Sequence, residues 1–477
     1  MRVLVVKTHS NHLFSIYGEA CRLSPDRRKP MKYVLQILAV IVVGSLVFDC
    51  FSQENEAGNV EKKILTLEDC LKISREENLN VLRAREELER TKGVVKEGYS
   101  GAFPKIDATG SYTRIDESSI QEFEGIRFGS DEIYSASFGL TQKLYAGGKV
   151  GAGIRAAKLA DSLSRTSLIT TERQVDFEVK QAFYLALLTR DLIDVQVETV
   201  NLFSENLKNV EAKREEGQVS DYEVLRAKVA LSNIQPDLIR ARNNNRLALD
   251  NLKQILNLPL DNLIEVQGEL GMEEMSFVLG RLVETAMANR SEIVEQEITI
   301  KLREQNLRLA KSGKKPEVSF TGNYAGETQI FGESDPSDLL WGWRAGIVFT
   351  MPLFDGFETK GRVIQRIAEL KQSKIDLEAT KKKIELDVRQ AYFKFNEAVE
   401  VLESQRKNTE QAEESVRQSR VLADLGQVTQ FDLRDAQLEL RTARTNLESA
   451  LYEYDVAIAR LENAIGYNPE KLNTAGK

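Results

Sequence analysis

The sequence predicts a mainly helical protein that is built from two copies of one unit and carries four β-strands. Three observations indicate this fold class. The stretch from Ser135 to Ala230 recurs 209 residues later without a gap. Apolar residues repeat every seven positions along two very long runs, and four short segments alternate apolar and polar side chains as strands do. Repeated units of this kind usually pack side by side around a shared axis.

Residues 1–52 are expected to be an N-terminal extension that ends in an export signal. Residues 31–52 follow a basic cluster and hold an apolar run of about fifteen residues, which is short for a membrane span. Phe48 and Asp49 precede Cys50, whereas a lipidation site usually has small residues at these positions. Lipidation of Cys50 stays open, and so do the true start and the cleavage site. No later apolar run approaches the roughly twenty residues of a spanning helix. Any membrane crossing must therefore use strands.

Composition argues against several classes of function. The formal net charge of −8 disfavours a nucleic-acid partner. The two histidines, His9 and His12, precede the expected mature start, which leaves none for acid–base or metal chemistry. The three cysteines form no disulfide or zinc pattern, and no phosphate loop or nucleophile motif occurs. We expect no enzyme, no cofactor and no metal.

The first unit spans residues 64–258, and a capping box at Thr66 and Asp69 marks its start. Its expected elements are, in order, a helix at 65–99, strands at 106–113 and 134–144 on either side of an acidic loop at 117–131, a helix at 149–215, a glycine turn, and a helix at 221–258.

The second unit spans residues 276–466, between a linker at 259–275 and a C-terminal tail at 467–477. Its expected elements are a helix at 276–311, strands at 318–324 and 341–353, a helix at 358–425, a second glycine turn, and a helix at 431–465. At 1.5 Å per residue the two longest helices would each reach roughly 100 Å.

The apolar repeat along these two long helices predicts coiled-coil packing. In the first helix the expected contact residues are Val175, Val179, Ala182, Ala186, Ile193, Val200, Phe203, Leu207 and Val210. In the second they are Ile384, Val388, Ala391, Phe395, Ala398, Leu402, Ala412 and Val416.

The four strands have the length of tilted strands in a membrane β-barrel. Four strands cannot close a barrel, and lipid does not tolerate a bare sheet edge, so several chains must pool their strands. Two chains would give a filled eight-stranded barrel, and three a twelve-stranded one with a narrow channel. The alternative is a pair of solvent-facing hairpins that cap a helical rod. Aromatic residues on the strands favour the barrel, since membrane interfaces attract them: Tyr112, Tyr134, Tyr324, Trp341 and Trp343.

The chain resembles the TolC family of outer-membrane efflux channels over residues 64–466. The duplicated plan, the Leu-Tyr-Ala-Gly-Gly and Leu-Phe-Asp-Gly breaks at 144–148 and 353–356, and the two Gly-Gln-Val turns carry the resemblance. It implies a homotrimer in the lipid of the outer membrane, with a twelve-stranded barrel continued by a helical tunnel in the periplasm. It also implies a periplasmic adaptor (membrane fusion) protein and an inner-membrane transporter of the resistance-nodulation-division or ABC type.

The two glycine turns have a structural role and, by the resemblance, a functional one. Gly217 and Gly426 are expected at positive φ at helix C-termini, and Ser220 and Thr429 are expected to cap the following helices. The resemblance implies that the turns contact the adaptor: Gly217, Gln218, Val219, Ser220, Gly426, Gln427, Val428 and Thr429.

Asp432 and Asp435 share one helix face just after the second turn. As plain structure, acids in a first helical turn favour the helix dipole. The resemblance implies instead that they form the pore constriction, where three copies would bring six carboxylates together and raise some of their pKa values. The first repeat has Glu223 and Arg226 at these places, so only one turn per chain carries the acidic pair.

The function expected from these features is a passive exit duct of the outer membrane, driven by an inner-membrane partner. The alternative is a secreted or periplasmic coiled-coil scaffold without a pore. An adaptor is disfavoured because adaptors need a single helical hairpin, whereas this chain is duplicated. The sequence does not distinguish drug, metal or protein as cargo, and it does not fix the pump class.

Overall fold

The computed structural model of the protein describes residues 63–116, 118, 120–123, 126–128, 131–271, 275–328 and 339–466. The chain divides into two compact units, residues 1–60 and 61–477, and the described residues belong to the second. The predicted extension and export signal at 1–52, with Cys50, and the predicted tail at 467–477 lie outside the described residues.

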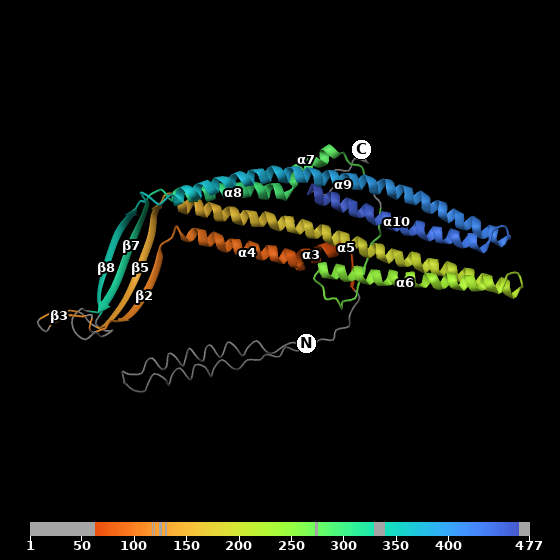
Figure 1. Cartoon of the computed structure of the whole chain (residues 1–477), viewed down its shortest axis with the longest axis horizontal. Helices are drawn as coiled ribbons and strands as arrows, with labels where there is room; N and C mark the ends of the chain where they lie inside the picture. The colour runs from red at the N-terminus through yellow and green to blue at the C-terminus, as the bar shows by residue number, and fades with distance from the viewer. Residues whose placement is uncertain are drawn as a thin grey trace, which may run out of the picture. The chain divides into compact units, whose positions relative to one another are not determined.

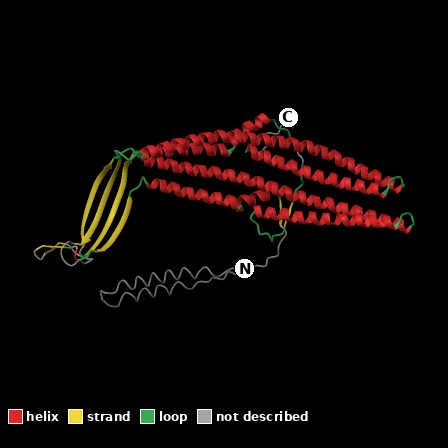
Figure 2. Cartoon of the chain, in the orientation of Figure 1, coloured by secondary structure: helices red, strands yellow, loops and turns green. Residues whose placement is uncertain are grey.

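The helices and strands repeat in the same order along the two halves of the chain (Figures 1 and 2). The first half contains β1 (Lys63–Leu65), α3 (Leu67–Glu77), α4 (Leu79–Ser100), β2 (Lys105–Arg114), β3 (Gln121–Phe123), β4 (Ile126–Phe128), β5 (Glu132–Ala146), α5 (Lys149–Glu215) and α6 (Asp221–Ile255). The second half contains β6 (Ile264–Val266), α7 (Leu279–Asn289), α8 (Ser291–Ser312), β7 (Glu317–Thr328), β8 (Leu339–Thr350), α9 (Glu358–Asp424) and α10 (Gln430–Ile465). Helices α5 and α9 both have 67 residues, which matches the predicted ungapped duplication.

The four long strands form one antiparallel sheet in the order β2-β5-β7-β8. The central pairing of β5 with β7 joins the two halves of the chain. Strands β2 and β8 are the edges, and within the described residues each pairs along one side only. The four strands predicted from alternation are confirmed, and the sheet leaves two rows of backbone groups to be paired elsewhere.

Each strand of the sheet continues into one helix, and the helices pack in the same order as the strands. β2 follows α4, β5 leads into α5, β7 follows α8, and β8 leads into α9. Helix α5 packs on α4 and α6 on one side and on α8 and α10 on the other, while α9 packs on α8 and α10. The described bundle therefore has four columns, α4/α6, α5, α8/α10 and α9, and among the described helices the first and last columns have a neighbour on one side only (Figure 1).

Two columns consist of a pair of helices that meet end to end. Asn78 precedes α4, and its amide nitrogen donates to the carbonyl of Ile255 at the end of α6 over 2.7 Å. Arg290 has the same place before α8, and its guanidinium donates to the carbonyls of Asn463 and Ala464 at the end of α10, each over 3.0 Å. Both contacts satisfy helix C-terminal carbonyls that have no partner within their own helix.

These end contacts correct two predictions. The single helices predicted at 65–99 and 276–311 are each broken, at Asn78 and at Arg290, and residue 65 belongs to β1. Asn78 caps α4 with its side-chain oxygen, which accepts from the N–H of Asn80 over 2.8 Å. The predicted capping box of Thr66 and Asp69 is present at the start of α3.

Two short strand pairs lie where the sequence predicts a linker and a loop. β6 lies in the predicted linker at 259–275 and pairs in parallel with β1, with Lys63 opposite Ile264. β3 and β4 form an antiparallel hairpin within the predicted loop at 117–131. Strands of three residues are too short to show an alternating pattern, so the sequence gives no sign of them.

The predicted coiled-coil residues form much of the core. Those of α9 are buried except Ala412, which is half-buried. In α5 the middle of the pattern differs: Ile193, Val200 and Leu207 are half-buried, and the buried residues there are Val195, Thr199 and Phe203. Among the described helices, α5 packs on a column at each side, whereas α9 packs on the α8/α10 column alone, apart from the short helix α7. The buried residues of α5 are therefore divided between two faces of the helix.

We expect Asn78→Ala to destabilise the first half of the bundle by about 1–3 kcal/mol, since it removes a helix cap and leaves a carbonyl without its donor. Chemical unfolding of the detergent-solubilised protein measures this change. Asn80→Ala, which leaves the cap oxygen in place, is the matched control. Equal stability of the two variants would contradict the end-to-end contact.

Candidate functional site: the helical turns and the sheet aromatics

The turn after each long helix is closed by a glycine at positive φ. Gly217 and Gly426 both have φ of 73°, as predicted. In each turn the next N–H reaches back five residues: Gln218 donates to the carbonyl of Lys213 over 2.8 Å, and Gln427 donates to that of Leu422 over 2.9 Å. This pattern satisfies the last carbonyls of α5 and α9. Of the predicted adaptor-contact residues, Val219 and Val428 are half-buried and the other six are exposed.

The two turns differ in how the next helix begins. At the second turn Thr429 and Asp432 form the predicted capping box: the carboxylate of Asp432 accepts from the backbone N–H of Thr429 over 2.8 Å and from its hydroxyl over 2.6 Å. At the first turn the predicted cap by Ser220 is wrong, since its side chain makes no capping bond. Glu223, which would complete a box there, instead binds Arg226 over 3.2 Å.

The predicted constriction residues, Asp432 and Asp435, are both exposed on the first turns of α10. The hydroxyl of Thr429, and then its backbone N–H, hold the pKa of the Asp432 carboxyl below its ordinary value. Within one chain Asp432 is thus a charged capping group. The predicted ring of carboxylates concerns several copies together and stays a prediction.

An aromatic stack joins the two turns, and the sequence reasoning missed it. The Phe431 ring lies between two guanidinium groups, that of Arg434 at 4.8 Å and that of Arg226 at 6.0 Å from its centroid. Arg226 also lies 5.7 Å from the ring of Tyr222. Such contacts contribute about 0.5–1 kcal/mol each when exposed. An aromatic residue three or four positions before an arginine occurs at the start of both helices, and that spacing could have indicated the stack.

The part of the bundle next to the turns is held by polar contacts together with a small apolar cluster of Val416, Ala436 and Leu440. Arg441 of α10 pairs with Asp237 of α6 over 2.9 Å, and Arg444 bridges Glu198 of α5 and Glu413 of α9. Among the described residues, buried side-chain atoms of α10 without a hydrogen-bond partner include the amide oxygens of Gln430 and Gln437 and Nε of Arg434. Buried polar atoms without partners cost free energy.

The sheet brings together four of the five predicted interface aromatics. Tyr112 and Tyr134 lie across β2 and β5 with ring centroids 5.0 Å apart, and Tyr324 stacks on Trp341 at 5.0 Å across β7 and β8. Trp343 is 81% exposed, so the described part of the chain leaves it largely uncovered. All five lie in the half of the sheet that is farther from the helices, as the strand registers place them.

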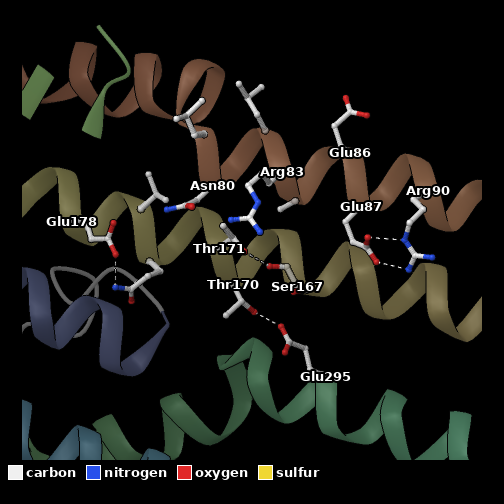
Figure 3. Close-up of a pocket in the computed structure, with 15 residues that line it drawn as sticks. Asn80, Arg83, Glu86, Glu87, Arg90, Ser167, Thr170, Thr171, Glu178 and Glu295 are labelled. Carbon is white, nitrogen blue, oxygen red and sulfur yellow. Dashed lines mark hydrogen bonds and ion pairs between the residues drawn. The ribbon is translucent and has the colours of Figure 1, made fainter. Parts of the chain in front are cut away.

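A groove of about 1080 Å³ lies between α4 and α5 (Figure 3). Along it Glu87 binds Arg90, and the hydroxyl of Thr170 donates to Glu295 of α8 over 2.5 Å. In the described part of the chain no group of three or more His, Cys, Asp or Glu side chains could hold a metal ion. None of the described helices is both long and apolar enough to cross a membrane.

Comparison with known proteins gives one consistent result. The family model described as Outer membrane efflux protein matches residues 71–258 and 282–467. The outer membrane protein TolC of Vibrio cholerae is 21% identical over 379 residues, which cover 78% of this chain and 84% of that protein. The alkaline protease secretion protein AprF of Pseudomonas aeruginosa is 22% identical over 365 residues, which cover 74% of this chain and 72% of that protein.

A solved structure shares the fold. The Campylobacter jejuni CmeC outer membrane channel superimposes with a TM-score of 0.69 at 18% identity, over 84% of this chain and 85% of that chain. The residues that match the family model come from both halves of the duplication and include both glycine turns.

The lowered pKa of Asp432 makes the start of α10 sensitive to acid. Because the folded-state pKa lies below the ordinary value of about 3.9, the capping contact is complete above pH 4 and is lost as pH falls through the folded pKa. We expect hydrogen-exchange protection of the Thr429 amide, which donates to the Asp432 carboxylate, to fall several-fold between pH 5 and pH 2.5 after correction for intrinsic rates. Asp432→Asn should lose this pH dependence and Asp435→Asn should keep it. Protection that does not change with pH in the unmodified protein would refute the charged cap.

Proposed function

Because this chain belongs to the outer membrane efflux protein family and is thus an outer-membrane exit duct for export, we propose that three copies assemble into one conduit and dock by their helical turns on a partner. The family consists of transport channels and not of enzymes. In this proposal the chain conducts cargo passively, and the energy comes from an inner-membrane transporter.

The proposed assembly is supported by one observation: the two edge strands of the sheet are continuous with the two outer columns of the bundle. β2 is continuous with α4 and β8 with α9, so each bare strand edge belongs to a column with an open flank. Pairing β8 of one copy with β2 of the next would complete both layers at once. Three copies would supply twelve strands, enough for a narrow channel, whereas the eight strands of two copies would leave a filled barrel.

In this assembly the exposed sheet aromatics would lie at one membrane–water interface. Tyr and Trp rings favour that depth because one end is apolar and the other forms hydrogen bonds. The stacked pair of Tyr324 and Trp341 and the exposed Trp343 support this placement. The glycine turns, at the other end of the long helices, would then be free to meet a periplasmic adaptor protein.

We further propose that Asp432 and Asp435 form the constriction at the closed end. Six carboxylates around one axis would repel each other unless cations or protons bind, so the closed end should select for cations. The stack of Arg226 on Phe431 would hold the second turn against the first, and the polar contacts around it allow the turns to separate without exposing a large apolar core.

The assembly is tested by mass. We expect the protein solubilised from outer membranes to have three times the mass of the mature chain in mass photometry, because one or two copies leave edges bare or close the lumen. A stable monomer in the membrane fraction would exclude the conduit. A water-soluble oligomer absent from that fraction would favour a coiled-coil scaffold without a pore.

The constriction is tested by conductance. We expect Asp432→Ala with Asp435→Ala to weaken cation selectivity and abolish block by multivalent cations in planar bilayers, while the trimer still forms, since alanine is a good helix former. Glu223→Ala is the matched control, because Glu223 is already paired with Arg226 at 3.2 Å and should matter little. If the double variant keeps the selectivity and the block of the unmodified protein, the two aspartates do not form the constriction and only stabilise the start of α10.

A further inference from the structure

The two faces of the four-stranded sheet differ in chemistry. Side chains alternate between the faces along each strand, and the registers place Ile106, Phe138, Tyr324 and Trp343 on the same apolar face. The middle rows of the opposite face carry mostly small or polar residues: Thr109, Ser135, Ser137, Gly139, Thr321, Asn323, Ala325, Gly342 and Gly346. In the proposed conduit the apolar face would lie against lipid, so this polar face would line the lumen.

Arg344 lies in the middle of the polar face. It is the sixth of the twelve residues of β8, and it is exposed. The registers pair it with Asn323 of β7 and pair Asn323 with Gly139 of β5, and the same row ends at Asp107 of β2. No hydrogen bond, ion pair or ring contact joins Arg344 to another described residue. Its positive charge is therefore uncompensated within the described sheet.

The acid and the base of this row are arranged differently. A side-chain carbon at Gly139 would lie 2.8 Å from Oδ2 of Asp107, so the Asp107 carboxylate lies over Gly139 and close to the sheet. Gly342 and Gly346 are the neighbours of Arg344 on the same face of its own strand. A side-chain carbon at either glycine would meet nothing within 4 Å. The Arg344 side chain is therefore not folded down along β8, and its guanidinium can reach into the space in front of the face.

We propose that Arg344 sets the charge selectivity of the sheet end of the conduit, where it favours anions and cargo that carries carboxylate or phosphate groups. The proposal rests on the assembly proposed above, in which three copies would bring three guanidinium groups around one axis. Arginine suits this role because its charge is permanent and its planar group binds carboxylate and phosphate through two parallel hydrogen bonds.

The charges of the polar face that lie nearer the helices compensate each other. Lys143 of β5 pairs with Glu317 of β7 over 2.9 Å. Lys105 lies two positions from Asp107 on the same face of β2, which is about 7 Å at the rise of an extended strand. Each of these two bases has an acid beside it, so neither pair adds net charge to the lumen.

Glu327 is the remaining charged residue of the polar face in the four long strands. It lies opposite Leu340, which precedes Arg344 by four residues on β8. Four residues of a strand span about 13 Å, which exceeds the screening length of about 10 Å in 0.1 M salt. The potential at Arg344 is therefore largely independent of Glu327.

Arg344 and the acidic pair at the second turn would act in different states of the conduit. Asp432 and Asp435 lie on helix starts that move apart when the turns separate, so their repulsion and their selectivity weaken on opening. Arg344 lies on a strand that is hydrogen-bonded to β7 along twelve paired positions, so it keeps its place. The selectivity of the open conduit would therefore depend on Arg344.

Reversal potentials in planar bilayers test the role of Arg344. They are measured in a gradient of potassium chloride near 0.1 M, in protein that also carries Asp432→Ala and Asp435→Ala, so that the other proposed selective site is absent. We expect Arg344→Gln to raise the permeability ratio of potassium to chloride at least about twofold, Arg344→Glu to raise it further, and Arg344→Lys to keep it. Lys143→Gln with Glu317→Gln is the matched control, because it removes a neutral pair from the same face.

Cysteine modification tests whether the side chain at position 344 faces the lumen. With Arg344→Cys we expect a cationic, membrane-impermeant methanethiosulfonate to lower the permeability ratio towards that of the unmodified protein, and an anionic one to raise it. Ala345→Cys is the matched control, since residue 345 lies on the apolar face and should not react with either reagent. Cys70 should stay unreactive, because burial raises the pKa of its thiol to about 12.

The outcomes separate this inference from the proposed function. A channel whose permeability ratio is the same before and after Arg344→Gln overturns the role of Arg344 and leaves the conduit intact. Reaction of Ala345→Cys in place of Arg344→Cys overturns it as well, because the two faces of the sheet would then be reversed. Protein that forms no channel before any substitution at Arg344 overturns the conduit itself. If Arg344→Glu does not assemble, Arg344→Gln and Arg344→Cys still decide the question.

Discussion

The structure depends on one constraint: the chain cannot satisfy the edges of its own sheet. β2 and β8 each present a row of backbone N–H and C=O groups without partners among the described residues. Such groups bind water poorly next to lipid, where each unpaired one costs several kcal/mol. Each long strand is continuous with a helix, so β2 and β8 belong to the columns α4/α6 and α9. Among the described helices, each of these two columns also has a neighbour on one side only. In the proposed assembly a single chain would be a segment of a larger ring in both layers.

Duplication lets one chain build this segment from two copies of a simple unit, and the copies have since acquired different roles. The long helices keep the same length and the same glycine turn. The helices that follow the two turns start differently. In the second copy α10 begins with a charged capping box, whereas in the first copy α6 begins with an ion pair. An assembled ring would therefore alternate two kinds of turn, and only one of them carries the exposed acidic pair.

The distribution of apolar contacts suggests where the bundle is firm and where it can move. The two large core clusters lie around the middle of the bundle, where α3 and α7 and the ends of α6 and α10 meet α5 and α9. Near the turns the contacts are a small apolar cluster, ion pairs and the stack on Phe431. Ion pairs at partly exposed sites contribute little stability each, so the turns can open locally while the middle stays packed.

The sequence by itself determined the features that are encoded within a few residues. The bounds of α5, the glycine turns at positive φ, the four strands and the Thr429–Asp432 cap follow from period, turn chemistry and capping signals. Tertiary structure alone decided the helix breaks at Asn78 and Arg290, since the carbonyls that hold them lie 177 and about 173 positions away. It also decided that Phe431 lies near Arg226 of the other repeat as well as near Arg434 of its own helix. A local pattern contains no information about which distant group will arrive, and these contacts exist only once helices far apart in the sequence are packed together.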